Sequence, residues 1–223
     1  MTYIKICGIT SCVDALAAIE AGADALGFIA VHESPRYVAA LDFQRIREHL
    51  PADFPLVVVA RRLGDAARYH APIVQYYEES ALDAGLDGTT RRMKVFRIRD
   101  EGDIERAASA GDEVDAVLLD AMHAALLGGS GTRFDWALVS PLRAALGRPL
   151  VLAGGLTPGN ITEALKVARP DAVDVSSGVE DDRPGVKSHD LVRKFIDAVR
   201  RWDAEQGVEP SGAFLSWRSG AAV

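Results

Sequence analysis

Short apolar runs alternate with longer, charge-dotted segments along most of this chain. The runs are rich in Val, Ile and Leu, and the Ala-rich segments between them carry charges at intervals, from the first residues to about residue 205. This alternation is typical of repeated units in which a β-strand is followed by a helix. It predicts eight strands: Tyr3–Cys7, Ala25–Ala30, Pro55–Ala60, Pro72–Tyr77, Met93–Ile98, Ala116–Asp120, Leu150–Ala153 and Ala172–Ser176.

The segments between these runs predict one helix after each strand. Parallel strands need crossover connections, and closing the sheet removes its edges, so this pattern favours a single (β/α)8 barrel of the TIM type. An open, doubly wound sheet is the alternative, but its glycine-rich dinucleotide motif is missing after the first strand, where Gly8 stands alone. The predicted helices are Cys12–Ala21, Asp42–His49, Asp65–Tyr69, Ser80–Ala84, Asp103–Ala110, Asp135–Leu146, Pro158–Ala168 and His189–Arg201.

The barrel is expected to occupy residues 1–205, and residues 206–223 to form a loosely ordered C-terminal tail. Glycines and a proline punctuate the sequence after Arg201, a composition typical of chain ends that do not pack. The same tail carries Phe214, Leu215 and Trp217, apolar side chains that can dock on the barrel or on a neighbour.

Composition and charge narrow the class of protein. The chain has 223 residues, of which 48% are hydrophobic, and a net charge of -7, so a globular protein without affinity for nucleic acid or anionic membrane is expected. No apolar run approaches the roughly 20 residues that cross a bilayer. Cys7 and Cys12 are the only cysteines, too few for a disulfide framework, and the histidines form no metal-ligand pattern. We therefore expect a cytoplasmic protein without a metal.

Glycine-rich turns follow the last two predicted strands. Gly154 and Gly155 come after the seventh strand, where Thr157 is the predicted N-cap of the next helix and Pro158 its first residue. The run Ser176-Ser177-Gly178 follows the eighth strand. Exposed backbone N–H groups at such turns and helix N-termini bind phosphate, and this is the usual place for it in a (β/α)8 barrel. The alternative is a pair of tight turns without a ligand.

Candidates for chemistry lie at other strand ends, because the carboxyl ends of all strands meet at one rim of a barrel. Asp120 ends an otherwise apolar strand and is suited to general acid or base catalysis. Cys7 ends the first strand, and Arg36, held behind Ser34-Pro35, is suited to bind a carboxylate. Structural roles are the alternatives: a turn-capping Asp, an inert buried Cys and a solvated Arg.

Several blocks of sequence, taken together and in order, resemble the phosphoribosylanthranilate isomerase family over about residues 3 to 200. The blocks are Lys5-Ile6-Cys7-Gly8-Ile9-Thr10, Ala21-Gly22-Ala23-Asp24-Ala25-Leu26-Gly27-Phe28, Ser34-Pro35-Arg36-Tyr37, Leu118-Leu119-Asp120, Gly128-Gly129-Ser130-Gly131, Phe134-Asp135-Trp136, Ala153-Gly154-Gly155-Leu156 and Val173-Asp174-Val175-Ser176-Ser177-Gly178-Val179-Glu180.

This resemblance implies an Amadori rearrangement of a phosphorylated small molecule, without a cofactor, by a monomer or a homodimer. It implies that Asp120 is the general acid, that Cys7 is the base, and that Arg36 holds the substrate's carboxylate. Gln75 carries over as a further substrate-binding residue. The phosphate side would consist of Gly154, Gly155, Asp174, Ser176, Ser177 and Gly178.

Two strand ends depart from the family pattern. The fourth strand usually reads Gln-Leu-His-Gly, whereas here it reads Gln75-Tyr76-Tyr77-Glu78, and the usual Phe-Val-Asn of the third strand is replaced by Val59-Ala60-Arg61. One wall of the expected pocket has therefore changed. The alternative function is that of a diverged barrel that acts on, or only binds, another phosphosugar.

Overall fold

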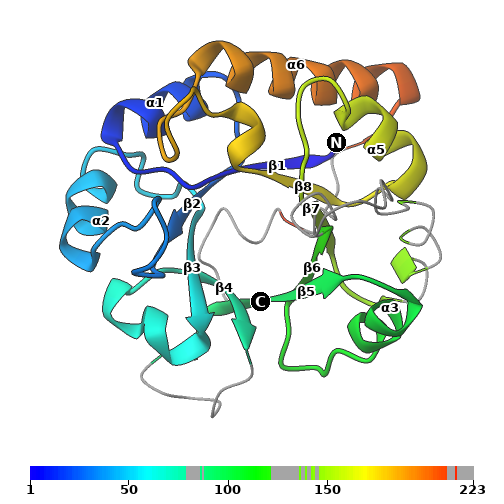
Figure 1. Cartoon of the computed structure of the whole chain (residues 1–223), viewed down its shortest axis with the longest axis horizontal. Coiled ribbons are helices and arrows are strands. Elements are labelled where there is room, and N and C mark those ends of the chain that lie inside the picture. Colours follow the sequence, from blue (N-terminus) through cyan, green and yellow to red (C-terminus); the bar gives the residue numbers. More distant parts are fainter. Residues whose placement is uncertain are drawn as a thin grey trace.

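Eight parallel strands close into a barrel in the computed structural model, and each strand pairs with its neighbours in chain order, β8 with β1 (Figure 1). The structure describes residues 1–78, 86, 88–121, 136, 139, 142–143, 146–209 and 214. The predicted fold class is confirmed. The strands are β1 Tyr3–Cys7, β2 Ala25–Ile29, β3 Leu56–Arg62, β4 Ile73–Glu78, β5 Arg91–Ile98, β6 Ala116–Ala121, β7 Leu150–Ala153 and β8 Ala172–Val175.

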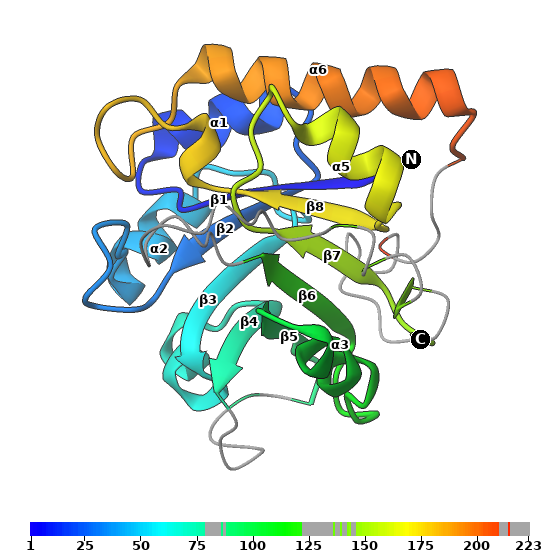
Figure 2. The ribbon, with the colours of Figure 1, turned by 45° about the vertical axis from the view of Figure 1, so that its right-hand side comes forward.

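Helices surround the barrel, and the longest, α6, lies across α1 and α5 (Figure 2). Polar side chains set several of the helix starts: Ser11 accepts a hydrogen bond from the Asp14 N–H at 3.1 Å, and Asp100 accepts one from the Asp103 N–H at 3.1 Å. The helical elements are α1 Cys12–Glu20, α2 Ala40–Arg47, the 3-10 helix η1 Leu63–Tyr69, α3 Glu101–Ala108, α5 Ile161–Ala168, the 3-10 helix η4 Ser177–Val179 and α6 His189–Gln206.

The ends of several helices lie a few residues from their predicted positions, and two predictions differ in kind or in the helix start. The segment predicted as a helix over Asp65–Tyr69 is a 3-10 helix. The helix after β7 begins at Ile161, so the prediction of Thr157 as its N-cap and Pro158 as its first residue is wrong. Its N-cap is Asn160, whose Oδ1 accepts from the Thr157 N–H at 2.8 Å and whose Nδ2 donates to the Gly155 carbonyl at 2.9 Å. These bonds hold the intervening residues in a turn.

Other predicted features lie outside the described residues. These are the helix over Ser80–Ala84, most of the helix over Asp135–Leu146 and the family-like block over residues 128–131. In the described part of the chain, no helix combines the length and the apolar character needed to cross a bilayer.

Two apolar cores hold the barrel together because side chains alternate across each strand. One core lies inside the barrel, and a larger one lies between the strands and the surrounding helices. Phe214 belongs to the inner core although it comes from the tail, is only 2% exposed, and stacks on Tyr3 with ring centroids 4.7 Å apart. Because Tyr3 is the first residue of β1, Phe214 packs at the amino end of the barrel.

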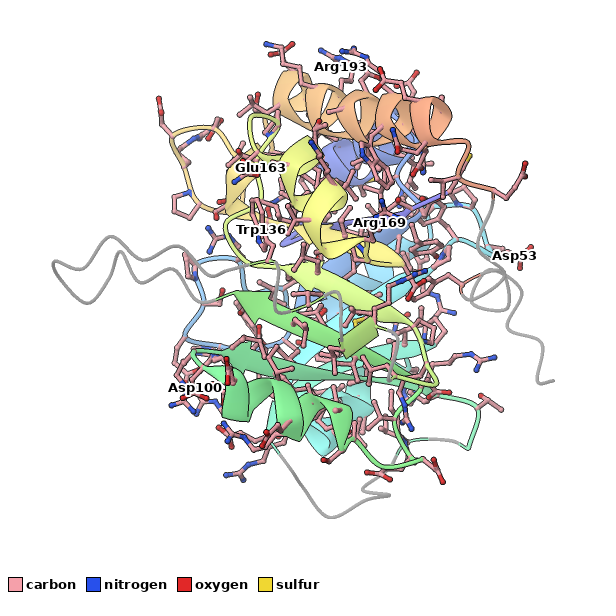
Figure 3. All side chains as sticks on the ribbon, turned by 90° about the vertical axis from the view of Figure 1, so that its right-hand side faces the viewer. Asp53, Asp100, Trp136, Glu163, Arg169 and Arg193 are labelled. Atoms are coloured by element: carbon pink, nitrogen blue, oxygen red, sulfur yellow. The ribbon has the colours of Figure 1, made fainter. Side chains whose placement is uncertain are left out.

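The two ends of the barrel are distinguished in the side view of Figure 3. Asp100, which follows β5, lies at one end, and Asp53, which precedes β3, lies at the other. The strands run from the second end to the first, and the candidate site lies at their carboxyl ends.

Candidate active site

A cavity of about 220 Å³ lies at the carboxyl ends of the strands. All the site residues predicted from the sequence line it, except Arg36. They are Cys7, Gln75, Asp120, Gly154, Gly155, Asp174, Ser176, Ser177 and Gly178. These residues come from β1, β4, β6, β7 and β8, so the barrel brings together positions from almost the whole chain.

Cys7 reaches this cavity because it is the last residue of β1 and faces inward. It pairs with Gly27 of β2, and a Cβ at Gly27 would lie 2.6 Å from the Cys7 sulfur. A larger residue at Gly27 would therefore displace the thiol. Cys7 is 5% exposed, which leaves its sulfur shielded from bulk water.

A buried ion pair lies one step deeper in the barrel. Lys5 Nζ lies 2.8 Å from Asp174 Oδ2 and donates to Gln75 Oε1 at 2.9 Å. Burial alone would lower the pKa of Lys5, but Asp174 and Cys7 together hold it above its usual value. Lys5 is therefore a permanent cation beneath the cavity. The sequence does contain a signal for Lys5, because a lysine two residues before Cys7 faces the same side of the strand.

The charges around Cys7 act in opposite directions on its thiol. Burial raises the pKa of Cys7, and the Asp174 carboxylate raises it further, whereas Lys5 and Lys187 lower it. The net result is a pKa above its ordinary value. The thiol is therefore protonated in the empty site at neutral pH.

Arg36 lies beside the cavity and is bound to Glu180. Arg36 Nε donates to Glu180 Oε1 at 2.7 Å, and its Nη2 donates to Oε2 at 2.6 Å. Lys187 Nζ also donates to Glu180 Oε1, at 2.9 Å. A Cβ at Gly8 would meet both Arg36 Cδ and Ser176 Oγ at 2.8 Å, so the Arg36 stem runs close to the cavity lining.

Glu180 and Lys187 belong to this network but were not predicted as site residues. Burial would raise the pKa of Glu180, but hydrogen bonds from Arg36 and Lys187 lower it to about 2. Glu180 therefore remains ionised and fixes the Arg36 guanidinium. The place of Glu180 in the Ser-Ser-Gly-Val-Glu run after β8 is a sequence signal for it, whereas no sequence pattern points to Lys187.

The turns after β7 and β8 form one side of the cavity. Gly154 and Gly155 have φ values of 91° and 62°, which favour glycine. Gly178 packs so closely on the Leu156 carbonyl that no Cβ fits there. Ser176 Oγ and Asp174 Oδ1 are buried, and neither has a hydrogen-bond partner among the described residues. Buried polar atoms usually have partners, so these two are available to a ligand.

No group of three or more His, Cys, Asp or Glu side chains within the described ranges is arranged to hold a metal ion. The cavity itself offers a thiol, carboxylates and the backbone of glycine-rich turns, and the cation of Lys5 lies beneath it.

The structure is a parallel eight-stranded barrel with glycine-rich turns after β7 and β8 and ionisable groups at the other strand ends. These features define its class: a (β/α)8 barrel with the architecture of enzymes that act on phosphorylated small molecules. The comparisons narrow this class to one family. The family model described as N-(5'phosphoribosyl)anthranilate (PRA) isomerase matches residues 4–198, and the chain belongs to this family.

Individual relatives agree with this assignment. The N-(5'-phosphoribosyl)anthranilate isomerase of Geobacter sp. (strain M21) is 42% identical over 216 residues, which cover 90% of this chain and 99% of the relative. The crystal structure of phosphoribosyl anthranilate isomerase from Thermotoga maritima has a TM-score of 0.78 and 37% identity, over 90% of this chain and 100% of that one. A second solved structure is of a phosphoribosyl anthranilate isomerase in complex with reduced 1-(o-carboxyphenylamino)-1-deoxyribulose 5-phosphate. It has a TM-score of 0.76 and 36% identity, with coverage of 90% and 100%.

Proposed function

We propose that this protein catalyses the Amadori rearrangement of N-(5-phosphoribosyl)anthranilate to 1-(2-carboxyphenylamino)-1-deoxyribulose 5-phosphate in tryptophan biosynthesis. The observation that carries the proposal is that Cys7 and Asp120 line the same cavity as the glycine-rich turns after β7 and β8, in a chain of this family. The reaction needs one acid and one base near a phosphorylated sugar, and the cavity offers each of them.

Asp120 and Cys7 divide the proton transfers. Asp120 donates a proton to the furanose ring oxygen, so that the C1–O bond breaks and a Schiff base forms. Cys7, as the thiolate, removes the proton at C2 and leaves an enolamine. The Cys7 thiol then gives its proton to C1 of the enolamine, and the Asp120 carboxylate accepts the proton of the C2 hydroxyl, which gives the ketone. Both groups are thereby returned to their starting protonation states, and the substrate is isomerised without a net change in atoms or electrons.

Substrate binding uses the two flanks of the cavity. The backbone around Gly155 and Gly178 would hold the phosphate. Ser176 Oγ and Asp174 Oδ1, which have no partner among the described residues, would bind donors on the sugar or its phosphate. Glu180 occupies the Nε edge of Arg36. The other edge, formed by Nη1 and the second Nη2 proton, would take the carboxylate of the anthranilate in a two-pronged bond. Gln75, whose Oε1 accepts a hydrogen bond from Lys5, would contact the sugar from beneath.

The ligand in the related complex supports this reading, because it carries a carboxyphenyl group and a phosphate on one sugar chain. The partner of this protein is then a small phosphorylated molecule. The proposal includes a monomeric or homodimeric protein in the cytoplasm.

A second candidate is a barrel that converts or only binds another phosphosugar. The observation that favours it is the altered wall: Tyr77 and Val59 line the cavity, and Arg61 follows on the same inward face of β3. Retention of Cys7 and Asp120 favours the isomerase, because a protein that only binds needs neither an acid nor a base.

The test is the loss of anthranilate-type fluorescence when purified protein meets freshly generated N-(5-phosphoribosyl)anthranilate. We expect rapid decay with the natural sequence and at least about a 100-fold slower turnover with Asp120→Asn, at similar substrate affinity. A folded protein that causes no decay would contradict the proposal. An Asp120→Asn protein with full activity would leave the reaction in place and remove Asp120 as its acid.

A further inference from the structure

Tyr77 lines the same cavity as Cys7 and Asp120. It takes no part in the proton transfers proposed for those two residues. It follows Ile73 and Gln75 at alternate positions of β4 and so faces the inside of the barrel. It also lines a second cavity of about 770 Å³, which extends over the ends of β2 to β5. Tyr77 is thus part of the wall that joins the two.

The ring of Tyr77 is held by a cation. The Arg97 guanidinium lies over this ring, 4.9 Å from its centroid, in the geometry of a cation–π contact. Arg97 comes from β5, where it is paired with Asp120 of β6 in the strand register. The contact therefore links the orientation of the ring to the strand that neighbours the predicted acid.

Arg97 differs from the other arginines of the second cavity. Arg61 lies 3.6 Å from Glu33, and Arg99 and Arg106 both pair with Asp103. For Arg97, no ion pair is found within the part of the chain that the structure describes. Its interaction there is the one with the Tyr77 ring, which is the role we assign to it.

The electrostatic surroundings keep the Tyr77 hydroxyl protonated. Burial raises its pKa, and the acidic groups Asp120, Cys7 and Asp174 raise it further, against a smaller opposing effect of Arg97. These three groups belong to the cavity that Tyr77 lines. The phenol is therefore a hydrogen-bond donor at any working pH, close to the groups that exchange protons with the substrate.

We propose that Tyr77 is a further catalytic residue of this chain, whose hydroxyl donates a hydrogen bond to a sugar oxygen of the substrate beside Asp120, with Arg97 as the positioning residue that fixes the ring. The proposal rests on the proposed function. The bond is worth most when negative charge develops on that oxygen, as it does on the furanose ring oxygen while the C1–O bond breaks. No covalent step is assigned to Tyr77.

The test is steady-state kinetics of N-(5-phosphoribosyl)anthranilate turnover with Tyr77→Phe, Tyr77→His and Arg97→Gln, each checked for thermal unfolding. Tyr77→Phe removes only the hydroxyl and should lower kcat about 10-fold or more, with KM changed less than threefold. Tyr77→His keeps an N–H donor and should retain more of kcat than the Phe variant. Arg97→Gln should lower kcat several-fold, and adding it to Tyr77→Phe should have little further effect.

Matched controls use the neighbouring groups. Tyr76→Phe removes a hydroxyl from the opposite face of the same strand, and Arg106→Gln removes a charge from the second cavity; both should leave kcat within twofold. A Tyr77→Phe protein with unchanged kcat, whether or not KM rises, would overturn the proposal. Independent, additive effects of Tyr77→Phe and Arg97→Gln would overturn the role of Arg97. If the natural sequence itself shows no turnover, the proposed function fails first, and this inference fails with it.

Discussion

Glu180 should contribute to stability in a pH-dependent way, because its pKa lies far below that of an exposed carboxylate. Hydrogen bonds from Arg36 and Lys187, against the opposing effect of burial, lower this pKa from 4.5 to about 2. At about 1.4 kcal/mol for each pH unit, the shift corresponds to about 3 kcal/mol of folding free energy. Glu180 is 9% exposed, so solvent screening removes little of this figure.

The sign follows from linkage. A carboxylate with a lowered pKa in the folded state stabilises the protein fully above its unfolded value of about 4.5, and this stabilisation is lost as the pH falls toward 2. Glu180→Gln keeps the shape but removes the charge, and leaves Arg36 and Lys187 without their anion. At pH 7 the variant should therefore be less stable than the natural sequence by about 3 kcal/mol.

The assay is urea unfolding of both proteins between pH 7 and pH 3. Subtracting one unfolding free energy from the other cancels the contributions of all carboxylates that the substitution does not affect. We expect this difference to shrink by about 2 kcal/mol between pH 7 and pH 3. A difference that stays constant over this range, or that is absent at pH 7, would refute the reasoning that the ion-pair network sets the pKa of Glu180.

Two further predictions concern the thiol and the tail. Burial and the Asp174 carboxylate raise the pKa of Cys7 above its ordinary value, and the base is the thiolate, so kcat/KM should rise with pH through neutrality and still be rising at about pH 8; a plateau below pH 8 would contradict this. Cys7→Ser should lower kcat at least about 100-fold. Phe214→Ala should lower the free energy of unfolding by about 3 kcal/mol, because the ring fills the amino end of the barrel. Calorimetry or denaturant unfolding measures this loss, and kcat/KM should stay within twofold. Unchanged stability would mean that the ring does not pack there in solution.

Much of the fold could be predicted because the barrel imposes a strong local pattern. Several strands are buried on both faces and so contain a continuous apolar run, as in Leu56–Ala60 or Leu150–Ala153. The boundaries were less predictable. Pro158 followed by an Ala-rich segment is typical of a helix start, yet the side chain of Asn160 bonds the Thr157 N–H and closes a turn instead. A side-chain bond of this kind leaves no periodic trace in the sequence.

The candidate site was predictable where a residue ends a strand, and less so where it acts through a distant partner. Cys7 and Asp120 were found because strand ends converge at one rim. Phe214 packs on a residue at the opposite end of the chain, a contact that no local pattern encodes. Glu180 and Lys187 likewise bind Arg36 and each other through contacts that only the closed barrel creates.

The opposing effects on Cys7 explain why both a buried cation and a buried anion lie beneath it. Asp174 alone would hold the thiol protonated, and Lys5 alone would favour the thiolate, but the two are 2.8 Å apart and act as a pair. Asp174 also has one oxygen without a partner in the described structure. A substrate donor bound to that oxygen would weaken the effect of Asp174 on the thiol and leave the cations dominant. By this argument, the base forms most readily when the substrate is in place, which protects the empty site from carrying a reactive thiolate.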